Sequence, residues 1–327
     1  MKRFNNILCV VEPDKASKTA LLQALYLAEH HQADLTIVST IETPGAWHFL
    51  FRTKEEEEGA LEAVIANKRL AIEQWIRSLD VDRSIKIDIL VGNPFLQIIR
   101  RVLQAQHDLV IKCSDDPDWM ARLFGSDDMH LLRKCPCPVL MLKAGHDKGF
   151  RQVLVAVDAN DEIDDADERQ IQHQLNLKLL HHAALFSISE MSQLHVGSVW
   201  DFYGEEFLRY GAFSHMSEEK VDEYISAIRG RCADRLRHLV DELNETVGQQ
   251  IAAYLQPSIH LVKGQPARAI PLMAQDYAID LIVMGTVART GIPGLIIGNT
   301  AEAILEQVTC SVLAIKPDGF VTPVDWR

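Results

Sequence analysis

The chain has 327 residues, of which 47% are hydrophobic and 24% are charged, a composition typical of a globular protein with a large buried core. This excludes wholesale disorder, and the length predicts two domains of roughly 150 residues each. With 46 acidic and 33 basic residues, the formal charge is −13. We therefore expect neither nucleic acid nor an anionic membrane surface as a partner, because both require an excess of Lys and Arg.

The first apolar run, from Ile7 to Val11, is too short for the core of a signal peptide. No other stretch approaches the roughly 18 apolar residues that a membrane helix needs. The chain has 6 cysteines, which are too few and too scattered for a disulfide framework. We therefore expect a cytoplasmic protein with no membrane partner.

The same order of motifs occurs twice along the chain. Residues 7–12 read ILCVVE, and residues 153–158 read VLVAVD. Four further landmarks follow in the same order: 33–38 with 192–197, 92–94 with 264–266, 108–111 with 280–283, and 139–143 with 312–316. This repeat predicts two similar domains, 1–146 and 150–320, divided at a short polar linker near residues 145–149.

Within each repeat, short apolar runs alternate with segments of helical periodicity. Runs such as Leu281 to Met284 lack polar alternation, which is typical of strands buried on both faces of a parallel sheet. Apolar residues recur at helical spacing in 61–76 and 221–243. The pattern predicts an α/β protein of two tandem doubly wound parallel-sheet (Rossmann-like) domains, with ligands beyond the carboxyl ends of the strands.

The segment from Ile282 to Glu302 carries the clearest indication of a binding site. A buried strand ends at Gly285, a loop with glycine and proline follows, and Asn299 or Thr300 is expected to cap a helix running toward Gln307. Glycines let backbone N–H groups approach an anion closely, and a helix start adds partial positive charge. Glycine spacing alone leaves two interpretations open, a phosphate cradle and a simple pair of turns.

This segment resembles the universal stress protein family, whose signature is Gly, two residues, Gly, nine residues, Gly, then Ser or Thr. Gly285, Ala288 and Gly298 occupy the three glycine positions, and Asn299 stands at the Ser/Thr position. Residues 285–302 and the tail 315–318 are similar to those of the tandem E-type members. The resemblance covers both repeats and is stronger in the second.

The resemblance implies a stress-response protein that binds a small ligand at the second repeat, foremost a nucleotide such as ATP or ADP. In ATP-binding members, an Asp after the first strand contacts the nucleoside, a residue near the end of the second strand packs beside the adenine, and the glycine motif holds the phosphates. These positions correspond to Asp158, to Val196 or its neighbours, and to Gly285, Ala288, Gly298, Asn299 and Thr300.

Two more residues are candidates for phosphate contacts, Thr286 through its hydroxyl and Arg289 through its charge. Ala288 puts a methyl group where the family has a glycine, which opposes a close approach of the backbone to a phosphate. No cofactor is certain, and ATP with Mg²⁺ is the one that the resemblance suggests.

The corresponding loop of the first repeat, residues 112–128, departs from the signature at Cys113 and Asp116. It also carries several further aspartates, which would repel a polyphosphate unless a metal intervened. These are Asp115, Asp118, Asp127 and Asp128. We predict that the first repeat has lost nucleotide binding.

Three other patterns are interpreted as structural. The acidic run 158–168 is a solvated loop rather than a calcium site, because Ile163 stands where an EF-hand needs Gly. The cysteines of residues 135–138 (CPCP) and the histidine pairs 30–31 and 181–182 are assigned packing roles. No catalytic triad or Walker motif stands out, so we do not expect an enzyme.

An aromatic cluster follows the second strand of the second repeat and comprises Trp200, Phe202, Tyr203, Phe207, Tyr210 and Phe213. It either anchors a loop or forms a lid over an apolar pocket. Two alternatives to nucleotide binding therefore stay open: a carrier or sensor of an apolar, lipid-like metabolite, and an interaction module without a ligand.

Members of the family dimerise through their final strands. The resemblance therefore implies that residues 139–143 and 312–316 pair within this chain as an intramolecular pseudo-dimer. A further homodimer is then optional.

Overall fold

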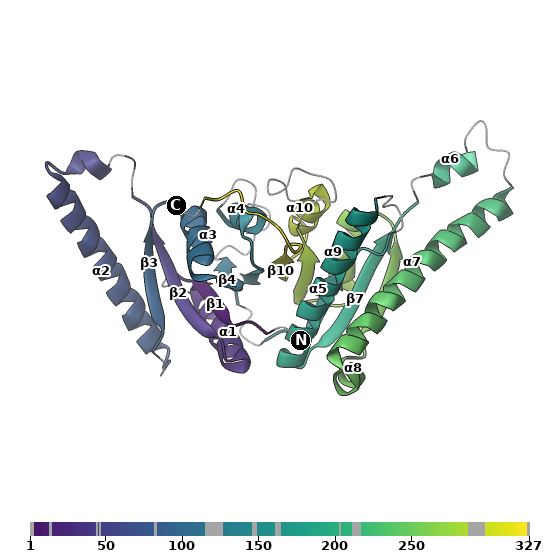
Figure 1. Cartoon of the computed structure of the whole chain (residues 1–327), viewed down its shortest axis with the longest axis horizontal. Coiled ribbons are helices and arrows are strands. Elements are labelled where there is room, and N and C mark those ends of the chain that lie inside the picture. Colours follow the sequence, from purple (N-terminus) through teal and green to yellow (C-terminus); the bar gives the residue numbers. More distant parts are fainter. Residues whose placement is uncertain are drawn as a thin grey trace.

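The computed structural model describes residues 3–12, 15–43, 45, 47–81, 84–114, 127–145, 149–160, 165–202, 204–210, 217–286 and 298–325. Their strands form a single ten-stranded sheet that runs through both repeats, with helices packed on its two faces (Figure 1). The α/β fold class predicted from the alternating pattern is confirmed.

The two repeats contain corresponding elements. The first contains β1 (Asn6–Val10), α1 (Lys15–His31), β2 (Asp34–Ile41), a 3₁₀ turn (Trp47–Leu50), α2 (Lys54–Ser78), β3 (Lys86–Val91), α3 (Pro94–Ala105), β4 (Leu109–Ser114), α4 (Asp127–Lys134) and β5 (Val139–Lys143). The second contains β6 (Gln152–Ala156), α5 (Ala166–Glu190), β7 (Gln193–Trp200), α6 (Glu205–Tyr210), α7 (Glu218–Val247), α8 (Gln249–Leu255), β8 (Ser258–Lys263), α9 (Pro266–Asp276), β9 (Leu281–Gly285), α10 (Asn299–Leu305) and β10 (Ser311–Ile315).

The strand order is β3-β2-β1-β4-β5-β10-β9-β6-β7-β8. Neighbouring strands within each repeat are parallel, whereas β5 and β10 pair antiparallel, with Leu140 opposite Leu313. The predicted pseudo-dimer is thus present, and its two halves are joined by main-chain hydrogen bonds between the final strands.

The repeated motif of Gly, one residue and Pro, at 92–94 and 264–266, has the same structural role in both repeats. Gly92 and Gly264 end β3 and β8 with φ of 121° and 141°, a conformation that only glycine adopts without strain. The prolines begin α3 and α9, where the missing N–H costs no helical hydrogen bond. The motif therefore turns the chain from a strand directly into a helix.

Alternate residues of each strand face opposite cores. Ile7 and Cys9 of β1 belong to the core covered by α1, α2, α5, α7 and α8. Leu8 and Val10 belong to the core covered by α3, α4, α9 and α10. Both cores contain residues of both repeats, so the chain is doubly wound and its halves share their hydrophobic interior.

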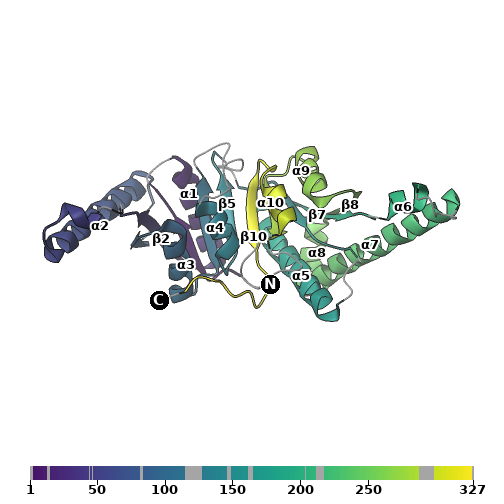
Figure 2. The same cartoon turned by 90° about the horizontal axis from the view of Figure 1, so that it is seen from above.

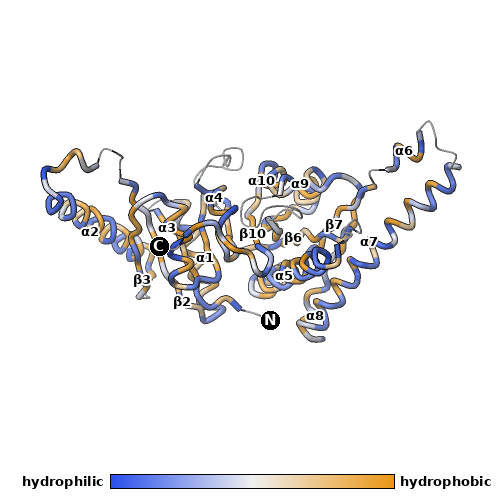
Figure 3. Tube along the Cα trace, turned by 45° about the horizontal axis from the view of Figure 1, so that its top comes forward, coloured by the Kyte–Doolittle hydropathy of each residue, from blue (hydrophilic) through white to orange (hydrophobic). Residues whose placement is uncertain are grey.

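The two long helices α2 and α7 lie at opposite ends of the sheet and project beyond it (Figure 1). Along both helices hydrophilic and hydrophobic residues alternate (Figure 3), as expected where one face contacts the sheet. The C-terminal segment crosses back to the first repeat (Figure 2), where Arg100 Nε donates to the carbonyl of Asp325 at 3.1 Å. Across the described ranges, no helix combines the length and apolarity that membrane crossing requires.

Candidate functional site

A cavity of about 450 Å³ opens at the carboxyl ends of β6 and β9. This is the edge where doubly wound folds bind ligands, and the volume lies within the roughly 300–1,000 Å³ of small-molecule sites. Its polar lining comprises Asp158, Asn160, Gln172, Asn176, Asp201, Asn299 and Thr300. Within the described part of this lining, no side chain carries a positive charge, so the cavity itself supplies no cation for an anionic ligand.

The cavity brings together residues that are far apart in the sequence. Asp158 from the end of β6, Gly285 from the end of β9, and Gly298, Asn299 and Thr300 at the start of α10 all line it. Every one of these residues was a candidate from the resemblance to the family. Ala288 and Arg289, two further candidates, lie outside the described residues.

Asp158 is held in place through its main chain by Asn176 of α5. The side-chain oxygen of Asn176 accepts from the Asp158 N–H at 3.0 Å, and its amide nitrogen donates to the Asp158 carbonyl at 2.7 Å. The Asp158 carboxylate accepts from the N–H of Asn160 at 3.1 Å. Asn176 is only 3% exposed. Sequence reasoning missed it, because it follows three other amides of the same helix, Gln170, Gln172 and Gln174.

Gly285 packs closely against α5, and its backbone conformation is an ordinary one. A Cβ at this position would lie 3.1 Å from Leu175 Cδ2, so the strand end fits against the helix because it has no side chain. The expected reason for this glycine, a close approach of the backbone to an anion, stays a prediction.

The helix after the loop begins differently from the prediction. Its N-cap is Gly298, with φ of −63°, and no side chain caps it, so the expected cap from Asn299 or Thr300 is wrong. The helix has 7 residues and ends at Leu305, which is too short for its N-terminus alone to make an anion site. The N–H of Gly298 donates to the carbonyl of Thr286 at 3.3 Å and so joins the two ends of the intervening loop.

Val196 does not line the cavity, and its expected contact with a ligand needs correction. It is 0% exposed within β7 and packs in the core. Because β7 continues to Trp200, the carboxyl edge of this strand lies at Val199 and Asp201, which do line the cavity. The neighbour Val199 replaces Val196 as the candidate beside a base.

Thr286 is likewise turned away from the cavity. It is 0% exposed, and its hydroxyl accepts from the Nζ of Lys316. Lys316 follows β10, is 3% exposed and also donates to the carbonyl of Leu132 at 2.6 Å. Desolvation by burial lowers the pKa of Lys316 to about 7. The sequence offered one signal for this residue, a lysine directly after an apolar strand.

The described members of the aromatic cluster stay away from the cavity. Trp200 is buried at 4% exposure, while Phe207 and Tyr210 are 66% and 82% exposed. Neither these three side chains nor that of Phe202 lines the cavity. The described part of the cluster therefore does not form the lid that one interpretation expected.

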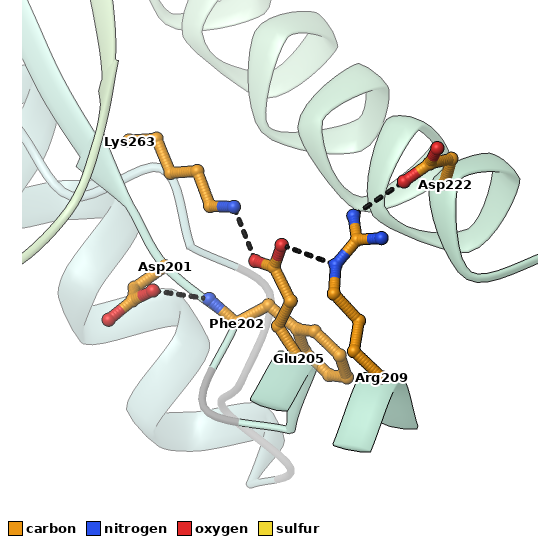
Figure 4. A network of polar contacts seen from close by, with 6 residues as sticks. All are labelled: Asp201, Phe202, Glu205, Arg209, Asp222 and Lys263. Atoms are coloured by element: carbon orange, nitrogen blue, oxygen red, sulfur yellow. Dashed lines mark hydrogen bonds and ion pairs between the residues drawn. The ribbon is translucent and has the colours of Figure 1, made fainter. Parts of the chain in front are cut away.

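A polar network holds α6 beside the end of β8 (Figure 4). Glu205 accepts from Lys263 and, at 3.1 Å, from Arg209 Nε, and Arg209 also pairs with Asp222 of α7. Hydrogen bonds from Lys263 and Arg209 lower the pKa of the Glu205 carboxyl. These contacts fit the interpretation of this region as an anchored loop.

In the first repeat, protein side chains satisfy the charges at the corresponding edge. Glu12 stands where the second repeat has Asp158, accepts from Ser39 Oγ at 2.7 Å and pairs with Lys68. Lys112 pairs with Asp128. The loss of nucleotide binding in this repeat stays a prediction, because residues 115–126 lie outside the described ranges.

The motifs interpreted as structural have structural contacts. Asp165, from the acidic run, caps α5 by accepting from two backbone N–H groups. Cys135 and Cys137 are buried free thiols with Sγ atoms 3.6 Å apart. His31 and His182, one from each histidine pair, pack against the ring of Phe4.

Comparison with known proteins agrees with this architecture. The universal stress protein family model matches residues 3–143 and 149–316. Universal stress protein E of Escherichia coli is 29% identical over 330 residues, which cover 99% of this chain and 98% of that protein. Universal stress protein E of Photorhabdus laumondii is 28% identical over 335 residues, with the same coverage of 99% and 98%.

Two solved structures have a similar fold. A universal stress protein from Pseudomonas aeruginosa has a TM-score of 0.66 at 26% identity, covering 97% of this chain and 95% of that chain. A universal stress protein from Archaeoglobus fulgidus has a TM-score of 0.60 at 16% identity, with coverages of 96% and 99%, and shows the fold alone. Because the two matches to the family model span nearly the whole sequence, this chain belongs to the universal stress protein family.

Proposed function

We propose that the second repeat binds a nucleotide, with ATP and ADP as the first candidates, in the cavity at the ends of β6 and β9. The observation that carries the proposal is the convergence of Asp158, Gly285, Gly298, Asn299 and Thr300 on this one cavity. On this account the protein is a stress-response binding protein, and it needs no chemical step.

The lining divides into parts that suit the parts of a nucleotide. Val199, Ile270 and Met284 are apolar and would accept the flat base, whose burial favours binding. The carboxylate of Asp158 suits the hydroxyls of a ribose as a hydrogen-bond acceptor. The backbone N–H groups of Asn299 and Thr300, in the first turn of α10, would face the phosphates.

The charge of the cavity predicts a requirement for a counter-ion. Asp158 and Asp201 both line it, and a polyphosphate beside two carboxylates is repelled unless a cation intervenes. Mg²⁺ fits these residues because it prefers carboxylate and phosphate oxygens. Asp158 and Asp201 would hold the ion, which would supply the positive charge that the phosphates need. We therefore expect ATP to bind more tightly with Mg²⁺ than without it.

A second candidate is the carriage of an apolar metabolite. Leu175, Leu179 and Ile304 also line the cavity and suit an aliphatic chain as well as a base. A module without any ligand is less favoured, because a cavity of this size is present. The polar residues around Asp158 favour the nucleotide over the aliphatic ligand.

Isothermal titration of the purified chain with ATP and Mg²⁺ tests the proposal. Asp158→Asn should weaken binding about tenfold, as expected for the loss of a charged hydrogen-bond acceptor. Glu12→Gln changes the corresponding position of the first repeat and is the matched control, with no expected effect. Absence of nucleotide binding by the unaltered chain, or equal losses in both variants, would contradict the proposal.

A further inference from the structure

Helix α4 of the first repeat lies beside α10 of the second, at the centre of the molecule (Figures 1 and 2). Arg133 of α4 donates to Glu302 of α10 from Nε at 3.0 Å, and its Nη2 bonds the same carboxylate oxygen. The side chains are 24% and 18% exposed. This ion pair is therefore partly shielded from solvent and is worth more than a fully exposed pair.

The preceding residue of α4 makes a second contact across the repeats. The carbonyl of Leu132 accepts from Lys316 Nζ at 2.6 Å, and the same Nζ donates to the hydroxyl of Thr286. Two consecutive residues of α4 thus contact the two ends of the signature segment. Leu132 is linked through Lys316 to Thr286, where the segment begins, and Arg133 binds Glu302 of α10, where it ends.

Among the described residues, these contacts have no counterpart in the opposite direction. Lys143 occupies the position in the first repeat that Lys316 occupies in the second, and it is exposed. Met129 occupies the position of Glu302, is 0% exposed and carries no charge. The first repeat therefore contacts the cavity edge of the second, whereas the corresponding reciprocal contacts cannot form.

The charge of Glu302 matters because of its position. It directly follows Asn299, Thr300 and Ala301, which line the cavity. An unpaired carboxylate there would repel an anionic ligand, and the effect would grow with the number of phosphates. Arg133 cancels this charge from outside the second repeat.

We propose that α4 of the first repeat is a positioning element for the cavity of the second, in which Arg133 neutralises Glu302 while Lys316, bound to Leu132, holds Thr286. The inference rests on the proposed nucleotide site and assigns a role to the repeat whose own site we predict to be lost. Arg133 and Lys316 act through Glu302 and Thr286 without touching the ligand.

Titrating variants of the full chain with ATP, ADP, AMP and adenosine tests the electrostatic part. Arg133→Gln should weaken ATP binding about tenfold, within the usual range of coupling between sites. The loss should shrink from ADP to AMP, and adenosine should be unaffected. Adding Glu302→Gln should restore ATP affinity, because no carboxylate then remains unpaired.

Arg101→Gln is the matched control, since it breaks a similarly shielded pair with Asp88, with side chains 17% and 24% exposed. It should leave all four affinities unchanged. An equal loss for adenosine and ATP in Arg133→Gln, or failure of Glu302→Gln to restore binding, would overturn the proposal.

Hydrogen exchange without ligand tests the positioning part separately. The Gly298 N–H is bonded to Thr286, and the Glu302 N–H to the Gly298 carbonyl. Both amides should exchange several-fold faster in Arg133→Gln and in Lys316→Met than in the unaltered chain or in Arg101→Gln. Unchanged exchange would overturn the positioning role even if nucleotides bind. Faster exchange in a chain that binds no nucleotide would refute the proposed function but keep the role of α4.

Discussion

Asn176 bonds both the N–H and the carbonyl of Asp158, at 3.0 and 2.7 Å. A buried side chain of α5 thereby fixes the first residues after β6, at the cavity edge. The position of Asp158 depends on this one amide, because both main-chain groups of the residue would otherwise need other partners in a part-buried site.

Replacing Asn176 by Leu removes both of its hydrogen bonds to the main chain of Asp158. We expect a loss of about 2 kcal/mol in the free energy of unfolding, the usual cost of losing two part-buried hydrogen bonds. Urea denaturation measures it. Gln172→Leu removes a single bond to Asn176 at 3.2 Å and should cost less, so equal stabilities of the two variants would contradict this role.

Gly285→Ala introduces a Cβ that would lie 3.1 Å from Leu175 Cδ2. Leu175 or the strand end must move, and we expect a destabilisation of about 1 kcal/mol, at the low end for overpacking. Gly230→Ala is the control, because a Cβ there meets nothing within 4 Å, and it should stabilise α7 by about 0.5–1 kcal/mol. Thermal unfolding measures both effects. A shift of the midpoint temperature in the same direction for both variants would contradict this explanation.

Lys316 makes the stability of the fold depend on pH in a defined direction. Burial lowers its pKa from 10.5 to about 7, so above pH 7 the unfolded chain holds a proton that the folded chain has released. The contribution of Lys316 to the free energy of unfolding therefore rises from about pH 7 to about pH 10 and is constant below pH 7.

Comparison with Lys316→Met isolates this contribution. The unfolding free energy of the unaltered chain minus that of the variant should increase between pH 7 and pH 10, as measured by denaturant titration at each pH. Lys143→Met removes an exposed lysine after β5 and is the control variant, measured in the same way. A flat difference for Lys316→Met would show that the pKa of Lys316 is not lowered.

The antiparallel pair of β5 and β10 predicts how the separated repeats behave. A fragment of residues 150–320 exposes the edge of β10, whose five residues are all buried in the chain, and exposed edges recruit further strands. We expect this fragment to dimerise, which sedimentation velocity would reveal. A monomeric fragment would contradict the importance of this edge and the proposed domain boundary.

The fold followed from the sequence because its signals are local and repeated. The apolar runs of β1 and β6, and Gly92 and Gly264 before their prolines, recur in the same order. The duplication, together with the resemblance to a family that dimerises through its final strands, predicted that these strands pair. The continuity of both cores across the repeats had no local signal, because it depends on how helices such as α1 and α5 meet around Phe4.

The site was predicted less completely. The resemblance to the family located Asp158, Gly285 and Gly298 at one edge. Val196 was misplaced because β7 extends to Trp200, beyond the compared run 192–197. The roles of Asn176 and Lys316 were not predicted, because they are set by tertiary contacts. The role of a buried amide or amine follows only from its partners on other elements.

The central claim is that the second repeat holds a nucleotide. Mass spectrometry of the small molecules released by denaturing the natively purified chain tests it most directly, because it presumes no ligand. We predict ATP or ADP in near-stoichiometric amount. Release of a lipid-like molecule, without any nucleotide, would contradict the account and favour an apolar carrier.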